Sequence, residues 1–308
     1  MRMPLLSSNA VVALLATVLF VAPATAQPVA DPTDLDMDGE PGVAEAPAVA
    51  NPQIPSALIG TGSVLVDHSH QNDFFVNGFT DYLATQGWTI AQHFSGPITE
   101  ALLSGYDILI VPTRSSSGPT NPFSASEVAA IQAFLAGGNG MWILNDAQNS
   151  DGINTLSTSF GVEFQSDYIQ DPSNNEGGRL YWPTIYLLSP HLITSGVGSY
   201  GYFAGDCLLA SPPSIAIATA DEDAYSSFCP AGSYPPVLAV WENVGRAVFS
   251  GDGTPLHPNY YPERLDADEE LLLQNIANWL LGDPPNATSA TSWGSLKRAH
   301  TARDDSKR

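Results

Sequence analysis

Short apolar runs alternate with amphipathic segments along the first half of this chain, and that alternation constrains its fold more than any other feature. Apolar runs typical of buried strands occupy 63–67, 88–93, 106–111 and 141–144. Segments with apolar residues near helical spacing lie between them, at 72–86, 98–103 and 124–136. Such alternation with nearly continuous apolar strands indicates an α/β fold whose mostly parallel sheet carries helices on both faces.

The second half of the chain predicts more strands and a closing helix. Strands are expected at 214–218, 237–241 and 246–249, the last two joined as a hairpin. The segment 266–281 is amphipathic and acidic in its first turn, as the helix dipole favours, so it is expected to be a helix. The region 165–213 is rich in Ser, Pro, Gly and Tyr, and it is expected to form long loops over one end of the sheet.

The N-terminus carries the pattern of a secretory signal peptide. Arg2 precedes the apolar stretch 10–22, and Ala24-Thr25-Ala26 forms a small-residue cleavage site before Gln27. The stretch is short for a membrane span, which makes an uncleaved anchor helix the weaker alternative. We therefore expect residues 1–26 to be removed and the chain to be secreted or periplasmic, with no membrane attachment after cleavage.

Charge and composition divide the rest of the chain into three parts. We expect an acidic Ala/Pro-rich linker at 27–58, a folded α/β domain at 59–283 and a disordered basic tail at 284–308. The chain has 32 acidic and 10 basic residues and a net charge of −22, most of which falls in the folded domain. A surface this acidic repels nucleic acid and anionic membranes, so neither is expected as a partner.

The linker contains a calcium-loop pattern. Asp34, Asp36 and Asp38 alternate along the chain, Gly39 permits a sharp turn, and Glu45 stands at the twelfth position. Converging carboxylates of this kind would bind Ca²⁺, the one cofactor that the sequence suggests. The Pro/Ala-rich flanks lack the paired helices of an EF-hand, so a plain acidic linker is the alternative.

The chain has two cysteines, Cys207 and Cys229, both in the folded domain. An even and sparse number in an exported protein favours a disulfide. A catalytic thiol is the alternative, although neither cysteine stands at a recognisable strand-to-helix turn.

A series of motifs resembles those of a known superfamily. Ser63-Val-Leu-Val-Asp67 with His70 resembles its V-L-h-D-x-x-H start, and Tyr106-Asp-Ile-Leu-Ile-Val111 is similar to its third strand. Similar segments follow in the same order at 124–138, 189–197, 245–252 and 275–280. Together they resemble the class I glutamine amidotransferase-like superfamily, and within it an uncharacterised secreted branch related to gliding-motility and intraflagellar-transport domains. The resemblance spans nearly all of 59–283 and implies a flavodoxin-like fold.

Compared with the amidotransferases of that superfamily, this sequence lacks the expected catalytic residues. Its amidotransferases place a nucleophilic Cys at the turn after a strand, with a His and a Glu near the C-terminal end. Here the turn after the strand 141–144 holds Asn145 and Asp146, and His257-Pro258 is followed by Asn259. Without the nucleophile and its orienting acid, we expect neither glutaminase nor cysteine-peptidase activity.

Polar residues follow several of the predicted strands, where ligands of open α/β sheets bind. The candidates for catalysis are Asp67, His70, Asp146 and Asp252. The candidates for ligand binding are His68, Arg114 and His257. Carboxylates with imidazoles could hold a divalent ion or act as a general acid/base pair, but Asp67 and Asp252 could equally brace loops by accepting backbone N–H bonds.

Three functions are compatible with these features. The first is a non-catalytic binding or accessory module for a glycan or a cell-envelope protein, favoured by the missing nucleophile and by aromatic residues concentrated in 168–203. The second is a metal-assisted or acid/base hydrolase that uses the four catalytic candidates. The third is a calcium-dependent surface protein in which the 34–45 loop and the acidic surface act.

Overall fold

The computed structural model describes residues 60–113, 120–146, 150–261, 265 and 267–282. The predicted signal peptide, linker and basic tail lie outside these residues, as do Arg114 and the calcium-loop pattern of Asp34, Asp36, Asp38 and Glu45. Among the described residues, no helix is long and apolar enough to cross a membrane.

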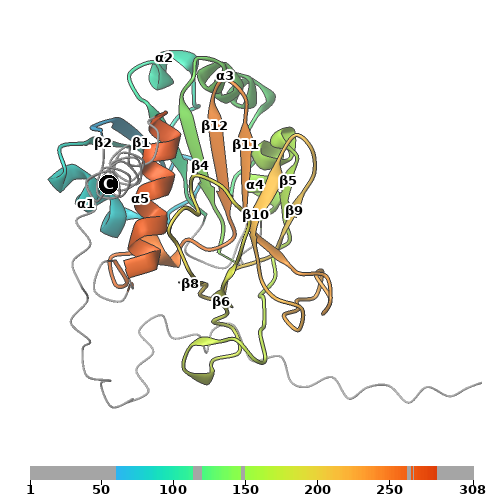
Figure 1. Cartoon of the computed structure of the whole chain (residues 1–308). Coiled ribbons are helices and arrows are strands. Elements are labelled where there is room, and N and C mark those ends of the chain that lie inside the picture. Colours follow the sequence, from blue (N-terminus) through green and yellow to red (C-terminus); the bar gives the residue numbers. More distant parts are fainter. Residues whose placement is uncertain (1–59, 114–119, 147–149, 262–264, 266, 283–308) are drawn as a thin grey trace, which may run out of the picture. The chain divides into compact units, whose positions relative to one another are not determined.

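The described residues form an eight-stranded sheet in the order β2-β1-β3-β4-β12-β11-β10-β7 (Figure 1). Its first five strands are parallel: β2 (Thr89–His93), β1 (Ser63–Asp67), β3 (Ile108–Val111), β4 (Gly140–Leu144) and β12 (Arg246–Ser250). The other three extend the sheet in antiparallel fashion: β11 (Pro236–Glu242), β10 (Ile215–Thr219) and β7 (Leu187–Leu188). The parallel part has the flavodoxin-like order 2-1-3-4-5, which confirms the expected fold class and the β11–β12 hairpin.

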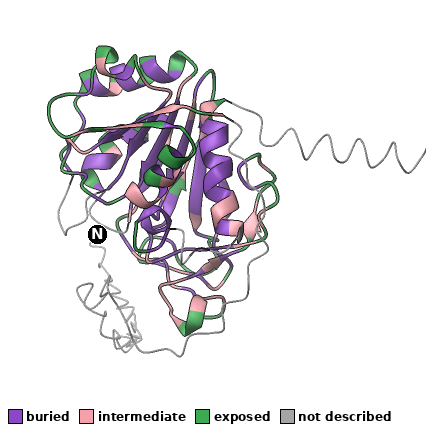
Figure 2. Ribbon diagram, turned by 90° about the vertical axis from the view of Figure 1, so that its left-hand side faces the viewer, coloured by how far each residue is buried: buried purple, intermediate pink, exposed green. Residues whose placement is uncertain are grey.

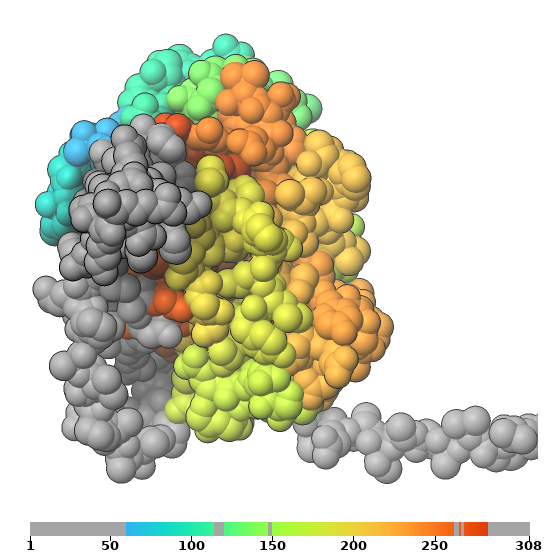
Figure 3. All heavy atoms as spheres, in the orientation of Figure 1, coloured from blue at the N-terminus to red at the C-terminus, as the bar shows by residue number. Residues whose placement is uncertain are grey.

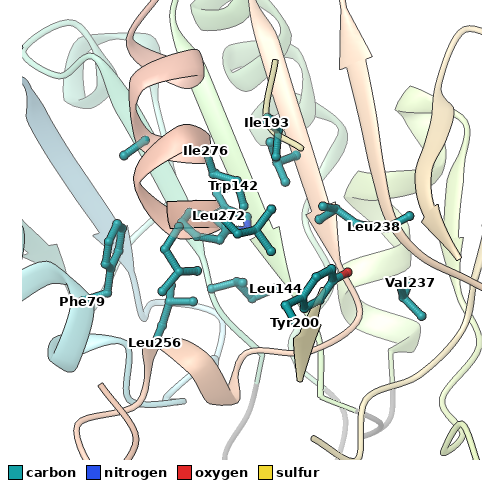
Figure 4. Packing of buried hydrophobic residues seen from close by; sticks show 14 of the residues in the cluster. Phe79, Trp142, Leu144, Ile193, Tyr200, Val237, Leu238, Leu256, Leu272 and Ile276 are labelled. Atoms are coloured by element: carbon teal, nitrogen blue, oxygen red, sulfur yellow. The ribbon is translucent and has the colours of Figure 1, made fainter. Parts of the chain in front are cut away.

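Helices cover both faces of the sheet because its apolar side chains alternate between them. Val64 and Val66 of β1 pack on the side of α1 (Asn77–Thr85) and α5 (Ala267–Leu281). Leu65 packs on the side of α2 (Glu100–Leu103), α3 (Ala125–Ala136) and α4 (Asp151–Ser157). Figure 4 shows the first core, where Trp142 and Leu144 of β4 meet Leu272 and Ile276 of α5. The strands of the sheet are accordingly mostly buried (Figure 2).

Local sequence signals account for α3 but only in part for α1. The Ser124 side chain accepts the N–H of Glu127 while the Glu127 carboxylate accepts the N–H of Ser124, so the predicted capping box closes as expected. The helix predicted from residue 72 begins only at Asn77, because the Asn72 side chain donates instead to the carboxylate of Asp67. The helix α4 has no counterpart among the predicted elements.

The region 165–213 is mostly loop, as expected, and includes short paired strands. These are β6 (Thr184–Ile185) with β8 (Tyr200–Gly201), and β9 (Leu208–Ala210) with the preceding β5 (Val162–Phe164). Single 3₁₀ turns occur at Thr158–Phe160, Glu176–Gly178 and Thr254–Leu256. Cys207 and Cys229 form the predicted disulfide, which ties this region to the loop before β11.

Candidate functional site

The carboxyl ends of the parallel strands place the candidate residues at one edge of the sheet. Asp67 ends β1, Asn145 and Asp146 follow β4, and Asp252 follows β12. Much of the yellow-green region 165–203 lies at this same end of the strands, at the bottom of Figure 1, and forms a continuous surface there in Figure 3. The site is therefore built from sheet-edge loops and from this loop region.

Asp67, His70 and Glu127 form a buried ion-pair cluster, here called the His70 clasp. His70 donates through Nδ1 to Asp67 Oδ2 at 2.9 Å and faces Glu127 Oε1 through Nε2 at 3.2 Å. Its ring stacks on Phe123 with 3.8 Å between centroids, and only 6% of the residue is exposed. The clasp joins the loop after β1 to the first turn of α3, at the point between β1 and β3 where the strand order reverses.

The electrostatics of the clasp favour a charged imidazole. Burial alone would lower the pKa of His70, but its hydrogen bond to Asp67 and the negative charges of Asp67 and Glu127 raise it above the usual value. Burial likewise opposes ionisation of Asp67, but hydrogen bonds from His70 and Ser69 lower its pKa. Since both ring nitrogens are held by carboxylates, His70 has no free lone pair with which to act as a general base.

The two other histidine candidates lie apart from the clasp. His68 is half-buried, pairs through Nδ1 with the carbonyl of Asn72 at 2.8 Å and stacks on Phe94. His257 is buried, accepts the N–H of Asn259 through Nδ1 at 3.1 Å, and meets Phe74 edge-on. Burial lowers the pKa of His257, which favours its neutral form.

Asp146, Asp206 and Asp252 form the acidic cluster beside β4 and β12. Asp206 is fully buried, and its Oδ2 accepts from Asn145 Nδ2 at 2.8 Å, while its Oδ1 has no hydrogen-bond partner among the described residues. Asp252 accepts the N–H of Phe203 at 2.6 Å and that of Thr254 at 2.7 Å. Asp146 is half-buried and is the member of the cluster that reaches the surface.

Burial raises the pKa of all three carboxyl groups of the cluster. Burial raises the pKa of Asp252 to about 7. Burial, together with the charges of Asp252 and Asp206, raises the pKa of Asp146 well above its ordinary value. Burial does the same for Asp206. A protonated carboxyl group can donate as well as accept a hydrogen bond, so Asp146, the member that reaches the surface, can offer both to a ligand.

Two aromatic residues, Tyr168 and Phe203, lie beside the acidic cluster, and further rings contact them. Tyr168 is half-buried and lies near enough to Asp146 for the charge of that carboxylate to raise its pKa, after the larger effect of burial. Tyr181 packs edge-on against Tyr168 with 5.9 Å between ring centroids. Half-buried Trp182 packs edge-on against Phe203 with 5.3 Å between ring centroids. Arg179 stacks over Trp182 at 3.8 Å from the ring centre. Half-buried rings beside carboxyl groups are suited to a ligand with both apolar faces and hydroxyl groups.

The four catalytic candidates do not converge into a single metal centre. Asp67 and His70 belong to the clasp, whereas Asp146 and Asp252 belong to the acidic cluster. Within the described part of the chain, one group alone brings three carboxylate or imidazole ligand atoms within 4.8 Å of one another, and it consists of Asp171, Asp221 and Asp223.

Several residues of these groups were not singled out from the sequence. The sequence marks Glu127 as part of a helix capping box, but its contact with His70 depends on the packing of α3 against the loop after β1. Asp206 stands in an irregular loop without periodicity, so no local pattern marks it. For the group of Asp171, Asp221 and Asp223, the sequence feature that could have indicated it is the spacing of Asp221 and Asp223, two aspartates separated by one residue.

Comparisons with known proteins support the fold. No protein-family model matches the chain, and no curated protein matches its sequence. The N-terminal domain of mmIFT52 superposes with a TM-score of 0.58 at 16% identity, covering 71% of this chain and 96% of that domain. Also similar are a ThuA-like protein from Bacteroides uniformis (TM-score 0.46, 14% identity, 73% and 94% covered) and a glutamine amidotransferase from Thermotoga maritima (0.42, 11%, 72% and 99%).

These likenesses concern the fold alone, because the identities are low. The mmIFT52 domain carries the structural argument, and together with the strand order it confirms the expected flavodoxin-like α/β arrangement.

Proposed function

We propose that this chain is an exported domain with an amidotransferase-like fold that binds a glycan at the acidic cluster and leaves it intact. The observation that carries the proposal is the pairing of half-buried aromatic rings with carboxyl groups of raised pKa at the carboxyl edge of the sheet, around Asp146 and Tyr168. Sugars offer apolar ring faces for stacking and hydroxyl groups for hydrogen bonds, so this combination matches their chemistry.

The state of the possible nucleophiles supports a binding role. Both cysteines of the chain are joined in the Cys207–Cys229 disulfide, which leaves no thiol to attack a substrate. The turn after β4, where the resemblance would place a nucleophilic Cys, begins with Asn145. This residue is fully buried and is hydrogen-bonded to Thr113 and Asp206. The disulfide also suits an oxidising compartment and so supports the proposed export.

A glycan array probed with the purified chain tests this proposal. We expect a defined set of glycans to bind, and Asp146→Ala or Tyr168→Ala to weaken binding at least tenfold because each removes a contact from the site. Asp146→Asn keeps a group that both donates and accepts hydrogen bonds, so it should bind within a few fold of the wild type.

Glu100→Gln serves as the control, since it removes one exposed acid at the start of α2 and should leave binding unchanged. An array on which no glycan binds, or on which Asp146→Ala and Tyr168→Ala bind as well as the wild type, would contradict the proposal.

An acid/base hydrolase is the second candidate, and one observation favours it. Burial raises the pKa of Asp252 to about 7, and the charge of Asp252 adds to the burial that raises the pKa of Asp146, so the two carboxyl groups influence each other's ionisation. Such a pair can supply a general acid and a general base. The two candidates differ in one measurable property, which is whether a bound glycan is cleaved.

A further inference from the structure

We propose a calcium-binding site formed by Asp171, Asp221 and Asp223, separate from the acidic cluster and from the 34–45 pattern. Asp171 belongs to the loop region after β5, and Asp221 and Asp223 follow β10. This proposal does not depend on the proposed glycan binding, because it concerns different residues and a different ligand.

The three carboxylates have the spacing of ligands around one large cation. Each contributes one oxygen atom, and these atoms lie within 4.8 Å of one another. Oxygen ligands lie about 2.3–2.6 Å from Ca²⁺, so two ligands on the same ion are separated by no more than roughly 5 Å. Asp171 is 1% exposed and Asp221 is 6% exposed, whereas half-buried Asp223 leaves a path to solvent.

The hydrogen bonding of Asp171 is a second observation that fits a cation in this group. Asp171 Oδ1 accepts the N–H groups of Ser173 at 2.9 Å and Asn174 at 2.7 Å. Asp171 Oδ2 is buried and has no hydrogen-bond partner among the described residues. A buried carboxylate oxygen without a partner costs free energy that a bound cation would offset.

The negative charge of the group has no protein counter-ion among the described residues. The ion pairs there involve His70 and Arg246, and Arg179 stacks on Trp182 instead. Three carboxylates with ligand atoms within 4.8 Å of one another repel each other when ionised. A divalent cation would relieve that repulsion.

The chemistry of the donors selects the class of ion. All three ligands are carboxylates carried by irregular loops, and no His or Cys accompanies them in the group. Hard oxygen ligands on loops suit Ca²⁺, whereas Zn²⁺ favours nitrogen and sulfur, and Mg²⁺ demands near-ideal octahedral geometry. Tyr186 donates to Asp221 Oδ2 at 3.0 Å, which places a fluorescent donor next to the proposed ion.

Terbium luminescence and calorimetry on the full chain test the site. Tb³⁺ resembles Ca²⁺ and emits when a nearby tyrosine or tryptophan is excited, so we expect sensitised emission that Ca²⁺ displaces. The 34–45 pattern is removed in the variant Asp34→Asn/Asp36→Asn/Asp38→Asn/Glu45→Gln, which should retain this emission and bind one Ca²⁺. In that background, Asp171→Asn and Asp223→Asn should each weaken Ca²⁺ binding at least tenfold.

Glu222→Gln is the matched control, because it removes an exposed acid between Asp221 and Asp223 and should bind Ca²⁺ normally. Asp223 is half-buried, so Asp223→Asn should fold and test the site even if Asp171→Asn folds poorly. Circular dichroism verifies the folding of each variant. The proposal is overturned if the variant without the 34–45 acids binds no Ca²⁺ at millimolar concentration. It is equally overturned if folded Asp223→Asn binds as tightly as Glu222→Gln.

Discussion

Asp206 is a costly residue for stability at its position. Its side chain is fully buried, and one of its oxygens has no partner among the described residues. Asp67 is equally buried but well partnered, since it accepts from His70, Asn72 and Ser69. The two aspartates therefore have opposite effects on stability. Asp67 stabilises the loop after β1 through its hydrogen bonds, whereas Asp206 supplies a carboxyl group to the candidate site and lowers the stability of the fold.

Asp206→Asn should stabilise the protein at pH 8. Burial raises the pKa of Asp206, so its native form binds a proton more tightly than the unfolded chain does. The stability that this proton contributes is fully present below the pKa of about 4 in the unfolded chain, and it is lost as pH rises through the pKa of the folded state. Asparagine carries no charge to be buried, so its advantage should be on the order of 1–3 kcal/mol at pH 8 and should shrink toward pH 5.

Urea unfolding at both pH values measures this difference. Asp67→Asn is the control, since the same chemical change at a partnered carboxylate should destabilise the fold by roughly 3–5 kcal/mol. If Asp206→Asn were less stable than the wild type at pH 8, the account of Asp206 as an unfavourably buried charge would be wrong.

At the scale of elements, the loop region is held to the sheet by a covalent link. The Cys207–Cys229 disulfide closes a loop with a sequence separation of 22, and Cys207 immediately precedes β9. In the chain-entropy model, a loop of that length corresponds to roughly 3 kcal/mol. The same region carries Tyr168 and Asp206, so the disulfide stabilises the elements around the acidic cluster.

The double variant Cys207→Ser/Cys229→Ser should lower the free energy of unfolding by about 3 kcal/mol. The central sheet has its own core and should remain folded, so circular dichroism at room temperature should change little. Reduction of the wild-type protein should produce a similar loss of stability. Equal stability of the oxidised wild type and the double variant would show that the bond does not constrain the chain.

Elements whose signals are local were predictable from the sequence. The strand 63–67 matches β1 residue for residue, and the capping box of Ser124 and Glu127 marks the start of α3. The start of α1 was not predictable, because the Asn72 side chain donates to Asp67 within the loop after β1 and does not cap a helix. The helix α4 was missed for lack of a strong apolar period in a short segment.

At the scale of the whole molecule, the position of the site was predictable but its composition was not. Parallel strands bring Asp67, Asp146 and Asp252 to one edge, and that follows from strand order alone. Which of them pair depends on residues from distant segments, namely Glu127 of α3 and Asp206 of the loop region. The expected four-residue site therefore divides into a structural clasp and a separate acidic cluster.

The central claim is that the acidic cluster binds a glycan and leaves it intact, and mass spectrometry of bound glycans tests it most directly. Glycans that the array identifies are incubated overnight with the wild type and with Asp146→Asn at pH 5 and pH 7. We predict that both proteins return the glycans at their original mass. Shorter products formed by the wild type and absent with Asp146→Asn would contradict the claim and establish a hydrolase that uses Asp146.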